Sequence, residues 1–389
     1  MTEETVSPED LYERLRRGDP VNLLDVRNRD EAEAWPLTGP SVESERVTYA
    51  EFMAVKARGE AEAFVADLGL DEPIVAVCPR GEASASVAEL LREQGLDARN
   101  LESGMEGWAR VYADRELPAD ATPEATVLQY DRPATGCLGY LVVSGDEAAV
   151  IDPLRAFADR YVADAEDRGA QLRYAIDTHV HADHLSGVQQ LASDEDVEPV
   201  LPTGATDRGL AFDATLLADG DELAVGDATL TALHAPGHTT ELTAFRLGDV
   251  LFSGDALFTD SFGRPDLERG DEGAGVLAGT LHETLTERLL ALPEDLLVAP
   301  GHRTPDETPN PDENETYTAR IGDVRDRLDV PAEKEAFVSG VLESLPPRPA
   351  NFEAIIPANL GREAIDDDSA FEIELGPNNC AVTTAAESD

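Results

Sequence analysis

The chain has 389 residues with 80 acidic and 30 basic side chains, which gives a formal net charge of −50. A hydrophobic fraction of 42% is too high for a disordered acidic protein, and the length predicts two or three domains. So acidic a chain excludes binding to nucleic acid or to an anionic membrane through a broad basic surface. The acidity is dispersed along a sequence with two lysines, Lys56 and Lys334. This composition is typical of a halophilic protein that stays soluble in concentrated salt.

The start of the sequence, MTEETVSPEDLYERL, is acidic and predicts a helix capped by Ser7, not a signal peptide. No stretch is apolar over the roughly 18 residues that a membrane span requires. The three cysteines, Cys78, Cys137 and Cys380, are far apart and odd in number, which disfavours a disulfide framework. We therefore expect a soluble, cytoplasmic protein with reduced thiols.

Residues 1–115 alternate short apolar strands with amphipathic helices. The strands are expected at 21–26 and 74–78, and a helix is expected at 83–94. This alternation predicts an α/β domain with a small parallel sheet. The following segment, ELPADATPEA at 116–125, interrupts the pattern and predicts a linker.

Residues 126–302 are rich in strands, with antiparallel pairs interrupted by helices and a long helix near 275–291. This order predicts a sandwich of two sheets with helices outside. Residues 303–389 contain a polar loop, a short helix at 331–343 and an acidic tail. We expect them to form a C-terminal extension that packs on the second domain.

Five of the seven histidines, together with two aspartates, occupy short loops at strand ends. The segments THVHADH, PGHT, FSGD and APGH contribute these side chains: His179, His181, Asp183, His184, His238, Asp255 and His302. Neutral imidazoles and carboxylates suit a divalent ion such as zinc or iron, and a His-x-His pair can direct both rings at one ion. The sequence therefore predicts a metal site at these strand ends. The other two histidines, His234 and His282, lack such a context and are expected to be structural.

This pattern resembles the metallo-β-lactamase superfamily over about residues 125–302. The resemblance implies an αββα sandwich with the metal site at one edge between the sheets. All seven ligand positions of the family are filled. On that ground alone, a two-metal hydrolase resembling glyoxalase II is an alternative.

Three further segments, PGHTTELTAF, LFSGDALFTDSFGRPDL and ESLPPRPANFEAIIPANLG, resemble the persulfide dioxygenase branch of the superfamily. That resemblance implies one Fe(II) per chain, held by His179, His238 and Asp255. Two histidines and one carboxylate form the facial triad of non-haem iron oxygenases, which leaves positions open for dioxygen and substrate.

The resemblance also gives roles to the remaining polar residues of these loops. Four of them would orient ligands and water, or hold a second metal: His181, Asp183, His184 and His302. Arg264, in the segment GRPDL, would anchor the carboxylate of a thiol substrate, with a surface salt bridge as its alternative role.

Cys78 ends an apolar strand, and the segment PRGEASAS after it opens a helix. The positive end of a helix and the nearby Arg80 both stabilise an anionic sulfur. With the segments at 25–27 and 101–112, this resembles a rhodanese domain over most of residues 5–114. The resemblance implies that Cys78 accepts a sulfane sulfur and holds it as a persulfide. The alternative is a buried, inert cysteine in a degenerate domain.

One position departs from the rhodanese pattern. The common family loop has an arginine just before the serine, whereas this sequence has Ala83 there, and its loop arginine is Arg80. The departure leaves the preferred sulfur donor open. Of the other cysteines, Cys137 is expected near the metal site, either as a redox-sensitive or sulfur-relaying thiol or as a small buried hydrophobic residue, and Cys380 has no assigned role.

We therefore expect a rhodanese-like domain at 1–115 fused to a metallo-β-lactamase-like dioxygenase domain at 126–302. The expected reaction oxidises a low-molecular-weight thiol persulfide with dioxygen to sulfite and thiol. Cys78 would transfer sulfane sulfur among the persulfide, thiosulfate and sulfite. The alternatives are a thioester hydrolase with two zinc ions and an accessory rhodanese domain, or a non-catalytic sulfur-carrier or sensing module. The thiol, the direction of sulfur transfer, persulfide channelling and the oligomeric state, homodimer or larger, are left open.

Overall fold

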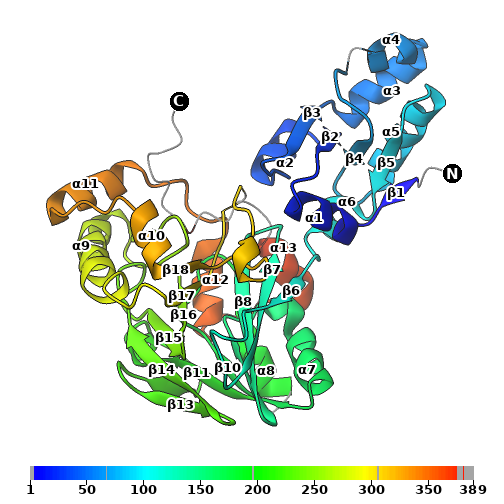
Figure 1. The fold of residues 1–389 in the computed structure, drawn as a ribbon. Coiled ribbons are helices and arrows are strands. Elements are labelled where there is room, and N and C mark those ends of the chain that lie inside the picture. Colours follow the sequence, from blue (N-terminus) through cyan, green and yellow to red (C-terminus); the bar gives the residue numbers. More distant parts are fainter. Residues whose placement is uncertain (1–3, 67, 195–196, 305, 375–379, 381–389) are drawn as a thin grey trace. The chain divides into compact units, whose positions relative to one another are not determined.

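The structure is a computed structural model that describes residues 4–66, 68–194, 197–304, 306–374 and 380 (Figure 1). It divides into two compact units. Unit 1 comprises Met1–Tyr112 with Arg132–Thr135 and Pro305–Thr308, and unit 2 comprises the rest of the chain.

Unit 1 is a five-stranded sheet of order β1-β5-β4-β2-β3 in which every pair is parallel. Its strands are β1 (Thr5–Val6), β2 (Val21–Asp25), β3 (Val42–Arg46), β4 (Ile74–Val77) and β5 (Ala98–Leu101). Its helices are α1 (Pro8–Arg16), α2 (Arg29–Ala34), α3 (Tyr49–Arg58), α4 (Ala61–Ala66), α5 (Glu82–Glu93) and α6 (Gly104–Trp108). The parallel α/β architecture expected for this part of the chain is confirmed.

Local sequence explains these elements. The Ser7 hydroxyl accepts the Asp10 amide and Pro8 occupies the first turn, so α1 begins where the sequence predicts. All residues of β4 are buried, as expected for a central parallel strand covered on both faces. Leu24 of β2 and Leu91 of α5 belong to the same core. The carboxyl end of β4 delivers Cys78 to the start of α5.

Unit 2 contains a seven-stranded sheet of order β12-β11-β10-β9-β8-β7-β6 and a six-stranded sheet of order β13-β14-β15-β16-β17-β18. The first sheet has β6 (Ala113–Glu116), β7 (Thr126–Arg132), β8 (Cys137–Ser144), β9 (Glu147–Ile151), β10 (Gln171–Ile176), β11 (Glu198–Pro202) and β12 (Thr215–Leu217). The second has β13 (Glu222–Val225), β14 (Ala228–His234), β15 (Thr243–Leu247), β16 (Val250–Gly254), β17 (Leu297–Pro300) and β18 (Ala319–Arg320).

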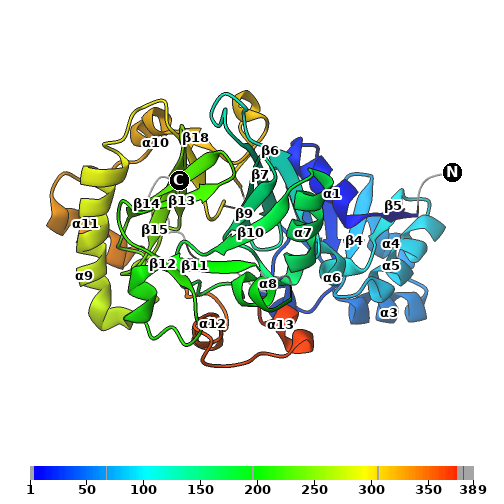
Figure 2. The same cartoon turned by 90° about the horizontal axis from the view of Figure 1, so that it is seen from below.

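The two sheets share one apolar core, to which Val142, Ile151, Phe245 and Phe252 contribute. Helices α7 (Ala158–Asp167) and α8 (Val188–Asp194) lie on one side of the sheets, and α9 (Gly270–Glu283) lies on the other (Figure 2). Unit 2 is therefore the expected αββα sandwich. Among the described residues, no helix combines the length and the apolar character needed to cross a lipid bilayer.

The segment expected as a linker, 116–125, is part of unit 2. Strand β6 pairs with β7 in antiparallel register, and Leu117 and Ala121 are buried in the unit 2 core. Prolines and aspartates do shape turns here, but the apolar residues between them fall where the chain contacts the core. Composition alone does not distinguish such an anchored turn from a linker.

The C-terminal extension packs on unit 2 through four helices: α10 (Ile321–Arg327), α11 (Lys334–Glu343), α12 (Phe352–Asn359) and α13 (Asp367–Ile373). Phe337 of α11 joins the core beneath α9, and Ile355 of α12 contacts the cluster around Leu185. The short helix expected at 331–343 begins at Lys334. The acidic tail lies outside the described residues.

Candidate functional site

The predicted metal ligands come from loops that follow four strands of unit 2. The β10 strand leads to His179–His184, β14 to His238, β16 to Asp255 and β17 to His302. All of these side chains are buried. Because β16 and β17 are paired in parallel, Asp255 and His302 emerge at the same sheet edge.

Three of these side chains, those of His179, His238 and Asp255, direct donor atoms at one point. Oδ2 of Asp255 lies 3.8 Å from Nε2 of His179 and 3.7 Å from Nε2 of His238. Within the described part of the chain, His179 Nε2 and Asp255 Oδ2 are buried without a hydrogen-bond partner. Buried polar atoms are almost always paired, so converging orphans of this chemistry fit a metal ion held between them.

In each of the three side chains, the polar atom that does not face the other two donors has a hydrogen-bond partner. His179 Nδ1 lies 2.9 Å from the Thr178 hydroxyl, and His238 Nδ1 donates to the Arg264 carbonyl at 2.7 Å. Asp255 Oδ1 accepts from His302 Nδ1 at 2.8 Å. Because a carbonyl only accepts, His238 carries its proton on Nδ1 and leaves the Nε2 lone pair for a ligand bond.

The protonation states also suit metal binding. Burial, reinforced by neighbouring histidines, holds the pKa of His179 well below its ordinary value, and burial also lowers the pKa of His238. Burial raises the pKa of Asp255, but the charge and hydrogen bond of His302 outweigh it and keep the pKa low. Neutral imidazoles and an ionised carboxylate are the forms that bind a cation.

Asp183 is the centre of a second hydrogen-bonded cluster. Its Oδ2 lies 2.9 Å from His302 Nε2, 3.0 Å from His184 Nδ1 and 3.4 Å from the Cys137 thiol. His302 therefore uses both ring nitrogens on carboxylates. Donor atoms of Cys137, Asp183 and His184 lie within 4.8 Å of one another, as do those of Asp183, His302 and Cys380.

His181 is turned toward carboxylates on the other side of the loop. Its Nε2 lies 3.1 Å from Asp152 Oδ1 and 3.6 Å from Asp177 Oδ1. Burial and His184 lower the pKa of His181, but Asp152 and Asp177 outweigh them and raise the pKa to about 9. His181 thus directs Nε2 at Asp152 and Asp177 and away from the converging donors, although its ring centroid lies 4.2 Å from that of His179.

Arg264 is buried, which differs from the surface salt bridge expected as its alternative role. Its buried guanidinium donates to Asp266 at 2.7 and 3.0 Å and to the Pro347 carbonyl at 2.8 Å. Arg348 pairs with the same aspartate at 2.9 Å. The guanidinium therefore lies in a buried ion pair and not in a surface salt bridge, and its role as an anchor for a substrate carboxylate stays a prediction. Its backbone carbonyl instead orients His238.

The cysteine loop of unit 1 holds the Cys78 sulfur between two donors. The Gly81 amide and the Ser84 hydroxyl each lie 3.1 Å from Sγ, and the side chain is buried. A Cβ at Gly104 would lie 2.1 Å from the Cys78 carbonyl oxygen, so this close approach requires glycine. Arg80 pairs with Glu106 at 2.6 Å on the surface. The donors to sulfur are thus an amide and a hydroxyl.

The two remaining histidines bond to backbone carbonyls, His234 to Thr240 at 2.9 Å and His282 to Pro331 at 2.8 Å. Several polar residues that support the metal loops had not been expected: Asp152, Glu241, Asn359, Glu374 and Cys380. Asp152 follows an apolar strand as Asp255 does, which is a usable signal. Asn359 and Glu374 lie far along the chain, and no spacing rule connects them to the histidines.

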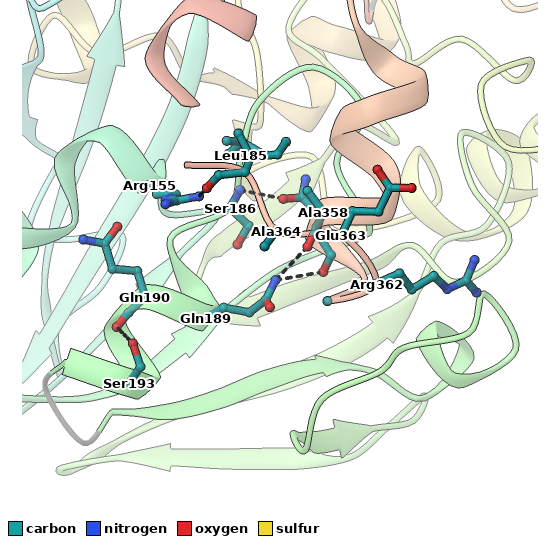
Figure 3. A pocket seen from close by; sticks show the side chains of 13 residues that line it. Arg155, Leu185, Ser186, Gln189, Gln190, Ser193, Ala358, Arg362, Glu363 and Ala364 are labelled. Carbon is teal, nitrogen blue, oxygen red and sulfur yellow. Dashed lines mark hydrogen bonds between the residues drawn. The ribbon is translucent and has the colours of Figure 1, made fainter. Parts of the chain in front are cut away.

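A pocket of about 640 Å³ lies beside the histidine loop (Figure 3). One wall is formed by residues that follow His184 in sequence, including Ser186 and Gln189, and another by Ala358 and Arg362 of the C-terminal extension. None of the three predicted metal ligands, His179, His238 and Asp255, lines this pocket.

Comparison with known proteins identifies two families along the chain. Residues 132–302 match the metallo-beta-lactamase superfamily profile, and residues 7–111 match the rhodanese-like domain profile. The human persulfide dioxygenase ETHE1, a mitochondrial protein, is 32% identical over 219 residues, which cover 55% of this chain and 78% of the human protein. This chain belongs to the persulfide dioxygenase family of the metallo-beta-lactamase superfamily.

A crystal structure of ETHE1 from Myxococcus xanthus superposes with a TM-score of 0.51 at 28% identity, covering 64% of this chain and 98% of that one. A hydroxyacylglutathione hydrolase from Parasynechococcus marenigrum is 33% identical over 174 residues, covering 42% of this chain and 64% of the hydrolase. Members of this family are enzymes of a metal-binding fold, and this chain carries a rhodanese-like domain in addition.

Proposed function

We propose that unit 2 oxidises a low-molecular-weight thiol persulfide to sulfite and thiol at a single Fe(II). The observation that carries the proposal is the convergence of donor atoms from two histidines and one carboxylate, His179, His238 and Asp255, with His179 Nε2 and Asp255 Oδ2 buried without a hydrogen-bond partner among the described residues. This is the donor set of the facial triad in non-haem iron oxygenases. The overall reaction consumes one dioxygen and one water per persulfide and releases sulfite, thiol and two protons.

Bound Fe(II) would supply dioxygen activation and a position for the terminal sulfur of the persulfide. The protein's part is to hold the three ligands in one geometry. His302 fixes the Asp255 carboxylate, and the Arg264 carbonyl fixes the His238 ring. The ligands are buried, so the surroundings exclude bulk water from reactive sulfur species.

The hydrogen bonds of His302 favour one metal over two. A second ion bound by His302 would have to displace one of its hydrogen bonds to Asp255 and Asp183. The alternative is a dizinc thioester hydrolase, which is supported by the resemblance to hydroxyacylglutathione hydrolases. Its ligands would include His184, whose Nε2 has no hydrogen-bond partner among the described residues.

We propose further that unit 1 transfers sulfane sulfur through Cys78. In the transfer, the Cys78 thiolate attacks the outer sulfur of a persulfide, the S–S bond breaks, and the thiol leaves as a thiolate. The anionic cysteine persulfide formed would accept from the Gly81 amide and the Ser84 hydroxyl, which already point at Sγ. The two units would then share the thiol persulfide as a common intermediate.

The deciding experiment measures oxygen uptake and sulfite formation by the purified protein with a panel of thiol persulfides, alongside metal quantification. One iron per chain with persulfide-dependent oxygen uptake supports the dioxygenase. Two zinc ions per chain with thioester hydrolysis and no oxygen uptake would establish the hydrolase instead. A protein that binds metal but shows neither oxygen uptake nor thioester hydrolysis would support the sulfur-carrier or sensing role.

A further inference from the structure

The loop that carries three of the histidines lies outside both sheet ladders. It runs from Thr178 to Ser186, between β10 and α8, and is buried. Buried backbone amides and carbonyls need partners, and here many are side chains from distant parts of the sequence. Asp152 accepts the Thr178 amide at 2.7 Å, and Glu241 accepts the Val180 amide at 3.0 Å.

Other side-chain hydrogen bonds to the backbone of this loop come from the C-terminal extension. Asn359, at the end of α12, donates to the carbonyls of His181 at 3.0 Å and His184 at 2.8 Å. Its Oδ1 accepts the Ser186 amide at 2.9 Å. Glu374 accepts the Leu185 amide at 2.8 Å. The extension thus holds the loop on both sides of Asp183 and His184.

The orientation of the Asn359 amide follows from its partners. Carbonyls can only accept and a backbone amide can only donate, so rotating the group by half a turn would lose all three hydrogen bonds. The side chain is 4% exposed, so water does not readily replace these bonds.

The extension also contacts the backbone behind His238. The carbonyl of Cys380 accepts the Arg264 amide at 2.9 Å, and the Arg264 carbonyl accepts from His238. Arg348 completes the buried pairing of Arg264 with Asp266. Two loops that supply proposed ligands are therefore supported by residues beyond 340, outside the matched superfamily region at 132–302.

We propose that Asn359 is a positioning residue of the metal centre and that Glu374 assists it. Asn359 fixes the backbone at His181, His184 and Ser186, and Glu374 fixes it at Leu185. Together they set the path of the Asp183–His184 pair and of the segment that directly follows His179. This proposal rests on the metal ligands assigned under the proposed function. It predicts that metal affinity depends on the Asn359 amide itself, not only on the volume that the side chain fills.

Three variants separate these roles. Asn359→Asp keeps the size and the acceptor for Ser186, but places a carboxylate against two carbonyls. Asn359→Ala removes all three bonds and leaves a cavity. Gln189→Ala is the matched control, because the Gln189 amide donates to the Ala358 and Asn359 carbonyls of the same helix, at 2.9 and 3.5 Å. Among the described residues, that amide has no hydrogen bond to the Asn359 side chain or to the backbone of Thr178–Ser186.

The readouts are the Fe(II) and Zn(II) dissociation constants and the EPR spectrum of the Fe(II)–nitric oxide adduct. We expect Asn359→Asp and Asn359→Ala each to weaken metal affinity about 10- to 100-fold and to alter the nitrosyl spectrum. Gln189→Ala should leave both unchanged. Folded Asn359 variants with wild-type affinities and spectra would overturn the proposal.

If the Asn359 variants do not fold, the Glu374 pair still tests the proposal. Glu374→Gln retains an acceptor for the Leu185 amide and should keep wild-type affinity, whereas Glu374→Ala should weaken it. Equal affinities in the two would overturn the proposal. Because affinities are measured for iron and zinc separately from turnover, a wild-type protein without oxygen uptake would refute the dioxygenase and leave this comparison intact.

Discussion

Nδ1 of His302 lies 2.8 Å from Oδ1 of Asp255. This hydrogen bond occupies one carboxylate oxygen and leaves the other facing His179 and His238. His302 therefore fixes the orientation of a proposed metal ligand, and in the one-iron site it need not bind metal itself.

Replacing His302 with alanine should weaken iron affinity about 10- to 100-fold without changing the limiting stoichiometry of one iron per chain. The reason is that Asp255 loses its orienting partner while all three ligands stay in place. Metal titration followed by elemental analysis measures both quantities. His282→Ala, which removes a histidine bonded to the Pro331 carbonyl, is the control. A fall from two bound ions to one in His302→Ala would point to the dizinc hydrolase.

Cys78→Ser should abolish sulfur transfer and leave persulfide-dependent oxygen uptake unchanged. The sulfur nucleophile belongs to unit 1, whereas the proposed iron ligands all belong to unit 2. The two activities are assayed separately, with a sulfane sulfur acceptor in one case and supplied persulfide in the other. Loss of oxygen uptake in this variant would mean that the dioxygenase reaction depends on Cys78.

Ala83→Arg should raise kcat/KM for thiosulfate several-fold in low salt. The loop arginine, Arg80, is paired with Glu106, and Glu82 adds a negative charge beside it, so a dianionic donor meets little positive charge. The gain should shrink in concentrated salt, which screens exposed charges. Steady-state kinetics with thiosulfate and with a thiol persulfide compare the donors. An unchanged preference would show that charge in this loop does not select the donor.

Asp266→Asn should lower the free energy of unfolding by about 3 kcal/mol at neutral pH, because it removes the carboxylate charge that is paired with the buried Arg264 cation. Burial raises the pKa of Asp266, but hydrogen bonds and charges from Arg264 and Arg348 outweigh it and hold the pKa below its ordinary value of 3.8. A depressed pKa adds stability above 3.8 that is lost as the pH falls through the folded-state pKa.

The gap between wild type and Asp266→Asn should therefore close in acid below that value. Denaturant unfolding at several pH values measures it. Asp271→Asn, which alters an exposed partner of Arg348, is the matched control and should have a small effect. If the difference in unfolding free energy between wild type and Asp266→Asn did not change with pH, the lost stability would be due to packing and not to charge.

Stability should also depend on salt. With a net charge of −50, repulsion among carboxylates opposes the folded state unless mobile ions screen it. Thermal unfolding midpoints should rise steeply from dilute buffer to molar salt. An equal midpoint in dilute buffer would show that local pairing, not the medium, offsets the charge.

The sequence was most informative where the chemistry is local. A few neighbouring residues are enough to identify the histidine segment, His238 beside its glycine and Asp255. In each case they show both the type of ligand and its position at the end of a strand. The two sheet architectures could be predicted for the same reason, because alternation of strands and helices is a local pattern.

What could not be predicted depends on the direction of side chains and on distant pairing. The sequence does not reveal that the Arg264 guanidinium is buried against Asp266. Residues 116–125 have the composition of a linker, yet Leu117 is buried in the core. Asn359 lies 175 positions from His184, and no periodicity connects them.

The hydrogen bonds from Asn359 to the histidine loop can form only late in the synthesis of the chain. A ribosome adds about 5–20 residues per second, so the side chain that holds the His184 carbonyl is made on the order of ten seconds or more after the histidine itself. During that interval, the nascent loop has its metal-binding groups without the residue proposed to arrange them. Metal loading should therefore be a late event, and a chaperone or a low free-metal concentration would protect the unfinished loop from binding the wrong ion.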